Sequence, residues 1–238
     1  MNTPGAVRSS FRRSGIAVGL LLLGAFATYG GGTALVNSVL AADDAASQLA
    51  TSEMTLRVGA ILMLTDVFFV AVIGVLLYNV GRRFSERIAV GYLSTRLIEA
   101  IGLAVGVVFV LLPVSLAGQE VGDAATLTAV AQQGNAIAYR IAMMALGLGS
   151  LPFWYLAYRI RLIPRALAAF GIAAYAIFFL GYALDILGLD VGLIAAIPGG
   201  IFEVAVALWL IVKGFSIPDP RGQPEPTSAP LRAEAELA

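Results

Sequence analysis

Six long apolar stretches divide the sequence, and they constrain its fold more than any other feature. They run at about 15–41, 56–78, 88–117, 135–158, 164–187 and 198–215. Each approaches or exceeds the roughly 20 residues that a helix needs to cross the hydrocarbon core of a bilayer. In lipid, only helices and closed barrels satisfy their own backbone hydrogen bonds, and stretches of this length are typical of helices. The sequence therefore predicts an all-α polytopic membrane protein with six transmembrane helices.

The overall composition agrees with a membrane protein. Of the 238 residues, 59% are hydrophobic and 13% are charged. A soluble chain carries a charged share of roughly a quarter. Acidic and basic residues balance at 15 each, so the net charge indicates no nucleic acid as a partner. The partner that the composition predicts is the lipid bilayer.

The first apolar stretch has two interpretations. Residues 1–14 are polar and basic, and 39–41 resemble a signal-peptide cleavage site. The apolar part is longer than the roughly 7–15 residues of a signal-peptide core, which favours a retained helix. We therefore expect a cytoplasmic N-terminus at 1–14 and a transmembrane domain at 15–215. The remainder, 216–238, is rich in Pro, Ala and Glu and is expected to be a disordered cytoplasmic tail.

The basic residues indicate the orientation of the spans, because Lys and Arg accumulate on the cytoplasmic side of a membrane. Most of them fall at alternate connections and at the two termini, and Arg57, Arg96 and Arg140 are the exceptions among the 15. Both termini are therefore predicted to be cytoplasmic (N-in/C-in), with acidic loops facing outward. Aromatic residues near the inner ends predict an interfacial belt. They are Tyr78, Phe153, Trp154, Tyr155, Tyr158 and Trp209.

Local signals suggest where the later spans begin. Residues 118–134 are polar and predict a loop, within which 124–132 form a short surface helix. The fourth span is expected to begin afterwards, near Asn135. Proline is favoured at the first position of a helix, so Pro198 is expected to begin the sixth span.

Six charged residues lie inside the predicted spans, where charge is costly and is expected to face the protein interior. They are Asp66, Arg96, Glu99, Arg140, Asp185 and Glu203. Arg96 and Glu99 are three residues apart, so they share a helix face and form a potential ion pair. Counted from the ends of their spans, the other four lie towards the outer half of the membrane. The arrangement predicts a polar cavity that opens to the outside, with Arg96 and Glu99 at its floor.

These charges have a functional and a structural interpretation. In the functional one, they form a site that binds or moves a small solute, with Glu99, Glu203 or Asp66 as proton carriers. In the structural one, Arg96 pairs with Glu99 and Arg140 pairs with one of the other three acids, so that the charges hold helices together. The protein would then be a non-catalytic accessory subunit. Four acids and two bases leave at least two acids without a basic partner of their own.

Several short stretches also resemble a known family. They are 55–59, 94–100, 163–167, 181–185, 202–203 and 208–215. In their order and spacing they resemble the DUF4386 family of small six-helix bacterial membrane proteins, whose function is unknown. The resemblance covers residues from about 12 to 215 and implies the six-helix fold. We expect the protein to lie in a bacterial inner membrane. The resemblance implies no activity and no catalytic residue.

The sequence offers little for catalysis or cofactor binding. Histidine and cysteine are both absent, which removes the usual ligands of zinc and haem and the base of a serine hydrolase triad. The acid in 181–185 has no second motif with which to form an aspartyl protease site. We expect no catalytic residue, metal or cofactor. The remaining partners to consider are a small-molecule ligand, a second copy of the chain and a membrane partner subunit.

Overall fold

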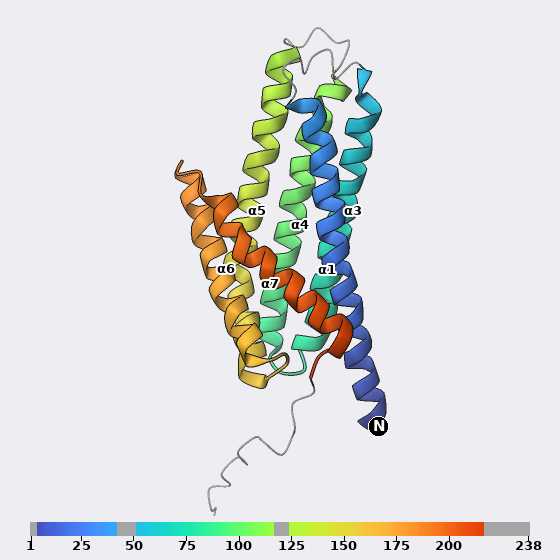
Figure 1. Cartoon of the computed structure of the whole chain (residues 1–238), viewed down its shortest axis with the longest axis vertical. Helices are drawn as coiled ribbons and strands as arrows, with labels where there is room; N and C mark the ends of the chain where they lie inside the picture. The colour runs from blue at the N-terminus through green and yellow to red at the C-terminus, as the bar shows by residue number, and fades with distance from the viewer. Residues whose placement is uncertain (1–3, 42–50, 117–123, 217–238) are drawn as a thin grey trace, which may run out of the picture.

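The computed structural model describes residues 4–41, 51–116 and 124–216, and within them the chain forms six helices and no strand (Figure 1). The helices are α1 (Pro4–Leu40), α3 (Glu53–Gly81), α4 (Glu86–Ser115), α5 (Ala124–Ile160), α6 (Arg165–Ile186) and α7 (Gly192–Lys213). All six are long and apolar enough to cross a membrane. The all-α prediction is confirmed, and the six helices indicate a multi-pass membrane protein. The predicted tail, apart from Ser216, lies outside the described residues.

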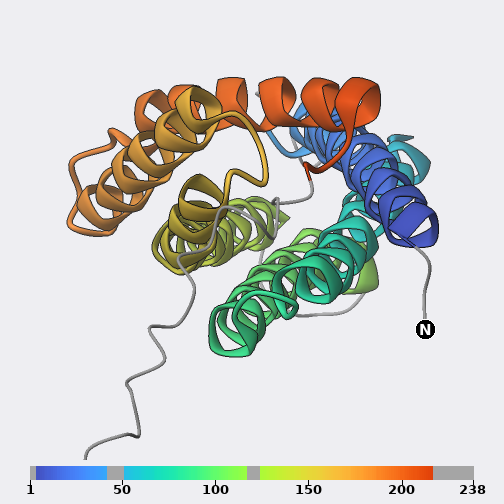
Figure 2. The ribbon, with the colours of Figure 1, turned by 90° about the horizontal axis from the view of Figure 1, so that it is seen from below.

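The six helices form a closed ring. Each packs against its neighbours in the chain, and α7 returns to pack against α1. Figure 2 shows this ring end on, with α7 lying across from α6 to α1. In the ring order α1, α3, α4, α5, α6, α7, the helix opposite α4 is α7 and the helix opposite α1 is α5. Side chains that join opposite helices must therefore cross the interior.

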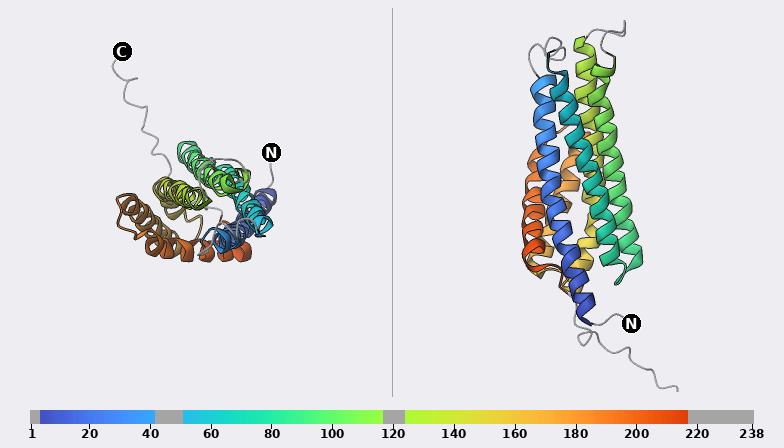
Figure 3. Two further views of the ribbon diagram at one scale, coloured as in Figure 1. Left: turned by 90° about the horizontal axis from the view of Figure 1, so that it is seen from above. Right: turned by 90° about the vertical axis from the view of Figure 1, so that its right-hand side faces the viewer.

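The ring has two parts that differ in the number of helices. The helices α6 and α7 have 22 residues each, whereas α1 and α5 have 37. The connection between α6 and α7 therefore lies part-way along the molecule, and only α1, α3, α4 and α5 continue beyond it (Figures 1 and 3). We call these the six-helix part and the four-helix end.

The core of the four-helix end contains no charged side chain among the described residues and is mainly apolar, with Thr128 of α5 as a buried polar residue. It is built from Val36, Val39, Leu40, Leu56, Ala60, Met63, Val107, Val110, Val114 and Ala131. The helices α1 and α3 approach each other closely here, because a Cβ on Gly32 would lie 2.7 Å from the carbonyl oxygen of Gly59. Small residues that permit such contact are typical of helix pairs in membranes.

The core of the six-helix part is rich in aromatic side chains. Phe153 and Trp154 are buried there, with their rings 5.4 Å apart, and Trp154 also meets the Phe202 ring at 4.8 Å. The sequence-based prediction of an interfacial belt is therefore wrong for Phe153 and Trp154, which point into the ring. Tyr78 and Tyr158 lie at the end of the bundle beside Arg82 and Arg165, as such a belt requires.

Two predicted helix starts are wrong. The helix α5 begins at Ala124 and continues without interruption through Gly134. A Cβ on Gly134 would lie 2.2 Å from the Phe109 ring, so this glycine marks a close contact with α4 and not a loop. Pro198 lies inside α7, six residues after its first residue. The proline therefore does not begin the last span.

Candidate functional site

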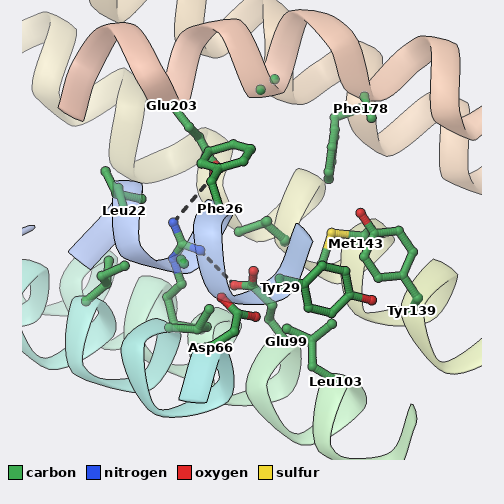
Figure 4. A pocket seen from close by; sticks show the side chains of 18 of the residues that line it. Leu22, Phe26, Tyr29, Asp66, Glu99, Leu103, Tyr139, Met143, Phe178 and Glu203 are labelled. Carbon is green, nitrogen blue, oxygen red and sulfur yellow. Dashed lines mark hydrogen bonds and ion pairs between the residues drawn. The ribbon is translucent and has the colours of Figure 1, made fainter. Parts of the chain in front are cut away.

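A pocket of about 150 Å³ lies inside the six-helix part, and all six helices contribute to its lining. Its polar side chains include Asp66 from α3, Arg96 and Glu99 from α4, and Glu203 from α7. Four of the six charged residues predicted as site candidates therefore converge on one space. Figure 4 shows this pocket from close by.

Arg96 lies at the centre of the polar side chains. Its Nη1 donates to Oε2 of Glu99 at 2.8 Å, and its Nη2 lies 3.8 Å from Oε1 of Glu203. Its Nε donates to the hydroxyl of Tyr92 at 2.8 Å, and the guanidinium lies over the Tyr92 ring. The predicted pair of Arg96 and Glu99 is thus confirmed. Because α4 and α7 are opposite each other, the pair with Glu203 spans the interior of the ring.

Glu203 has a second partner on the neighbouring helix. The hydroxyl of Tyr175 donates to its Oε1 at 2.5 Å. The Tyr175 ring in turn packs against Trp154 and Phe202, so the hydroxyl is held by a buried aromatic group. The side chain of Glu203 retains 18% exposure, against 3% for Arg96. Glu203 is therefore fixed by its contacts while still being accessible from the pocket.

Asp66 differs from the other charged side chains of the pocket. It is only 4% exposed, yet among the described residues it makes no hydrogen bond and no ion pair within 4 Å. In Figure 4 its side chain points into the same space as Glu99. Burying a carboxylate without a partner is costly. Among the described acids of this pocket, Asp66 is therefore the one without a direct basic or hydrogen-bonding partner, although Arg96 attracts it electrostatically.

Glycines allow the helices to hold these side chains at short range. A Cβ on Gly74 of α3 would lie 2.8 Å from Cβ of Arg96, so any larger residue would push α4 away. A Cβ on Gly199 of α7 would lie 2.9 Å from the Phe178 ring. The positions of Arg96 and of the aromatic wall thus depend on residues that carry no charge.

Aromatic rings form much of the remaining wall. They are Phe26, Tyr29, Tyr139, Tyr175 and Phe178. Tyr29 of α1 stacks on Tyr139 of α5 with ring centroids 5.4 Å apart, across the ring of helices. These residues are not evident as site residues from the sequence, because an aromatic side chain within an apolar span is usually core. The available signal was the tyrosine hydroxyl, which needs a partner when it is buried.

The pocket reaches the surface between α1 and α7. Phe26 of α1 belongs to its lining and is 42% exposed. Gly200 of α7 lies beside it, since a Cβ there would be 3.9 Å from the Phe26 ring and would meet no other atom within 4 Å. A single aromatic side chain thus lies at this opening.

The two other predicted site residues form a separate group on α5 and α6. Nε of Arg140 donates to Oδ2 of Asp185 at 3.0 Å, and its Nη2 lies 3.6 Å from Oδ1 of Asp190. Oδ1 of Asp185 also accepts the backbone N–H of Gly192 at the start of α7. None of these residues belongs to the lining of the pocket. The expectation that all six charges share one cavity is therefore wrong for Arg140 and Asp185.

The geometry limits the chemistry of the pocket. Within the described residues there is no group of three His, Cys, Asp or Glu side chains that could hold a metal ion. The carboxylates of the pocket are instead distributed around an arginine and an aromatic wall. Such an arrangement can bind a solute that is larger than a bare ion.

The comparisons with known proteins give one match. The model of a family described as "Domain of unknown function (DUF4386)" matches residues 17–214. No curated protein and no solved structure matches the chain.

Proposed function

The chain belongs to the DUF4386 family, and from that premise we propose that it is an inner-membrane protein that binds, and moves, a small solute in its central pocket. The family carries no activity that could be transferred to this chain. The proposal therefore depends on the pocket itself.

One observation carries the proposal, namely that Asp66 is buried at the edge of a cavity without a partner. A carboxylate that only holds helices together has a basic or hydrogen-bonding partner, as Glu99 and Asp185 have. Ionisable groups at membrane depth are functional candidates by default. An unpaired acid beside an open space is what a site for an incoming ligand or proton requires.

The rival function is an accessory subunit in which the charges only hold helices together. The ion pairs of Arg96 and of Arg140 fit that role. Asp66 does not fit that role, because among the described residues it makes no ion pair or hydrogen bond with another helix. The pocket would also be superfluous in a purely structural bundle, since membrane helices pack closely where small residues allow it.

The proposal includes the N-in/C-in orientation. The start of α1, the turns after α3 and α5 and the end of α7 lie at one end of the bundle (Figure 1). Most of the described basic residues lie at this end, among them Arg82, Arg83, Arg161 and Lys213, whereas Arg57, Arg96 and Arg140 do not. By the positive-inside rule this end is cytoplasmic. The four-helix end then faces outward.

The orientation is tested by labelling single cysteines, which the cysteine-free sequence makes straightforward. In intact cells, Gln133→Cys at the four-helix end is expected to react with an impermeant thiol reagent. Arg83→Cys at the opposite end is expected to react only after the cells are opened. The reverse pattern would contradict the orientation.

The pocket is tested by a cysteine placed in its lining. We expect Ala196→Cys on α7 to react with a small thiol reagent in the folded protein. The matched control is Ala207→Cys, which lies on the same helix, is fully buried and does not line the pocket. In intact cells, an impermeant reagent can reach Ala196→Cys only from the outer water. A permeant reagent can also reach it through the bilayer beside Phe26. If neither an impermeant nor a permeant reagent modifies Ala196→Cys, the solute pocket is ruled out.

A further inference from the structure

We propose that the solute is a small organic cation, an ammonium group on a compact apolar body. This assignment rests on the solute pocket proposed above and names the chemical class of its ligand. It follows from the charge, the aromatic wall and the size of the pocket.

The charged groups of the pocket leave an excess of acid. Asp66, Glu99 and Glu203 face one arginine. Arg96 is already engaged by Glu99 and Glu203, at 2.8 and 3.8 Å. Asp66 is repelled by Glu99 and Glu203 and is attracted by Arg96, with which it makes no ion pair within 4 Å. A positive group beside Asp66 would supply the partner that the protein lacks, whereas an anion there would be repelled.

The aromatic wall favours an organic cation. A cation is attracted to the face of an aromatic ring, and quaternary ammonium ligands are commonly bound by several such rings together. The five rings of the wall come from α1, α5 and α6. Tyr29 also lies within electrostatic range of Asp66. One ligand can therefore contact the unpaired carboxylate and an aromatic face at once.

A metal ion fits the pocket less well. Hard cations such as Ca²⁺ require at least six oxygen ligands at about 2.3–2.6 Å. The described residues offer no cluster of three acids for such an ion. The rest of the lining is aliphatic, aromatic or glycine, as in Leu103, Met143 and Gly199. These surfaces suit methyl or methylene groups.

The size of the pocket limits the ligand. Its volume of about 150 Å³ is close to that of a protein cavity that accommodates benzene. A tetramethylammonium ion, choline or phenylethylammonium is of this order of size. A lipid or a long peptide does not fit within it.

The test measures binding of these three cations to the purified protein in detergent, by calorimetry and by the shift in unfolding temperature. Each cation is paired with an uncharged compound of similar shape, for example choline with 3,3-dimethylbutan-1-ol. Sodium chloride at equal ionic strength controls for salt. We expect at least one cation to bind and its uncharged counterpart to bind at least about tenfold more weakly.

Variants locate the binding site. Asp66→Asn is expected to weaken binding of the cation at least about tenfold, and Tyr29→Leu, which keeps an apolar side chain, to weaken it severalfold. The matched control is Asp185→Asn in the separate charged group, which is expected to bind as the wild type does. Size-exclusion chromatography confirms that each variant is folded.

The outcomes separate this inference from the proposed function. If Ala196→Cys is reactive but none of the three cations binds, the organic cation is wrong and the solute pocket stands. Equal binding of the uncharged compounds, or an equal shift with sodium chloride, also overturns the cation assignment. If Ala196→Cys is unreactive and no cation binds, both proposals fail.

Discussion

Two arginines in this protein each face two carboxylates, yet their surroundings differ. Arg96 pairs with Glu99 on its own helix and with Glu203 on the opposite helix, and all three lie inside the ring. Arg140 pairs with Asp185 on the neighbouring helix and with Asp190, and the side chains of Arg140 and Asp185 are 30% and 9% exposed. Asp190 is 84% exposed. We call these the inner and the outer charged group.

The difference between the two groups shows how burial changes the contribution of an arginine–carboxylate pair to stability. An ion pair with a partly exposed member, such as Arg140 with Asp185, is screened more by solvent than a fully buried pair and contributes less to stability. A buried pair costs much to desolvate, and removing one partner strands the other charge. The inner group also contains the unpaired Asp66, whereas both acids of the outer group contact Arg140. The inner group therefore combines a structural arginine with a carboxylate available for a ligand.

The largest expected effect is that of Arg96→Met. This change leaves Glu99 buried without a basic partner, so we expect the free energy of unfolding to fall by about 3–5 kcal/mol. Unfolding by a denaturing detergent in mixed micelles measures the change. The matched control is Arg140→Met, for which we expect a smaller loss, because Asp185 still accepts the N–H of Gly192 and Arg140 is partly exposed. Equal losses in the two variants would remove the distinction between the groups.

A double-mutant cycle sharpens the same comparison. Glu99→Gln alone is expected to destabilise the protein, because the longer contact with Glu203 is then the remaining ion pair of Arg96. In the double variant Arg96→Met/Glu99→Gln we expect the loss in free energy of unfolding to be smaller than the sum of the losses in the two single variants, which is a partial recovery of stability. Recovery is incomplete because Glu203 has also lost its arginine. A double variant as stable as the wild type would show that Glu99 is only a structural partner and carries no proton.

The next effect concerns the close approach of α3 and α4. Gly74→Ala places a methyl group 2.8 Å from Cβ of Arg96, so we expect a loss of about 1–3 kcal/mol from overpacking. Gly91→Ala on α4 is the control, because no atom lies within 4 Å of its added Cβ. That change is expected to be neutral or slightly stabilising. The same unfolding measurement compares the two variants.

A smaller effect is expected in the outer group. Asp185→Ala removes both the pair with Arg140 and the acceptor for the N–H of Gly192. We expect a loss of about 1 kcal/mol, typical of a helix cap. Asp185→Asn keeps an acceptor for that N–H and is expected to lose less. If the two variants are equally destabilised, the contact with Gly192 contributes nothing.

The smallest change in stability is expected for Asp66→Asn. Asp66 has no partner to lose, so unfolding of the ligand-free protein is expected to be unchanged or slightly more difficult. Glu99→Gln, in contrast, is expected to destabilise the protein. A large loss in Asp66→Asn would show that Asp66 has a structural partner and would contradict its assignment to the ligand.

Much of the fold could be predicted from the sequence, because apolar length alone indicates the spans. The ends of the spans were less predictable. The polar residues before Gly134 resemble a loop, yet they continue α5 because other helices supply their contacts there. The side-chain amide of Gln132, for example, donates to the carbonyl of Leu40 on α1. Such contacts between distant segments leave no local signal in the sequence.

The site was predictable only where its contacts are local. The spacing of Arg96 and Glu99 indicates their pair directly, since three residues on a helix bring them to one face. The partner of Arg140 remained one of three acids, because the sequence indicates depth in the membrane but not the order of helices around the ring. The ring order also places Asp66 on α3 and Asp185 on α6, which are opposite each other in the ring.

The pair within α4 has a consequence for the order of biosynthesis. The arginine at its centre reaches the membrane together with its own counterion, three residues further along the chain. Chains are made from the N-terminus, so this span is inserted well before α7, and its charge is already balanced at that time. Glu203 and Gly200 arrive only with the last span. The opening between Phe26 and Gly200 lies between the first helix and the last. The pocket is therefore completed only when α7 is in place. A chain truncated before α7 has no complete site.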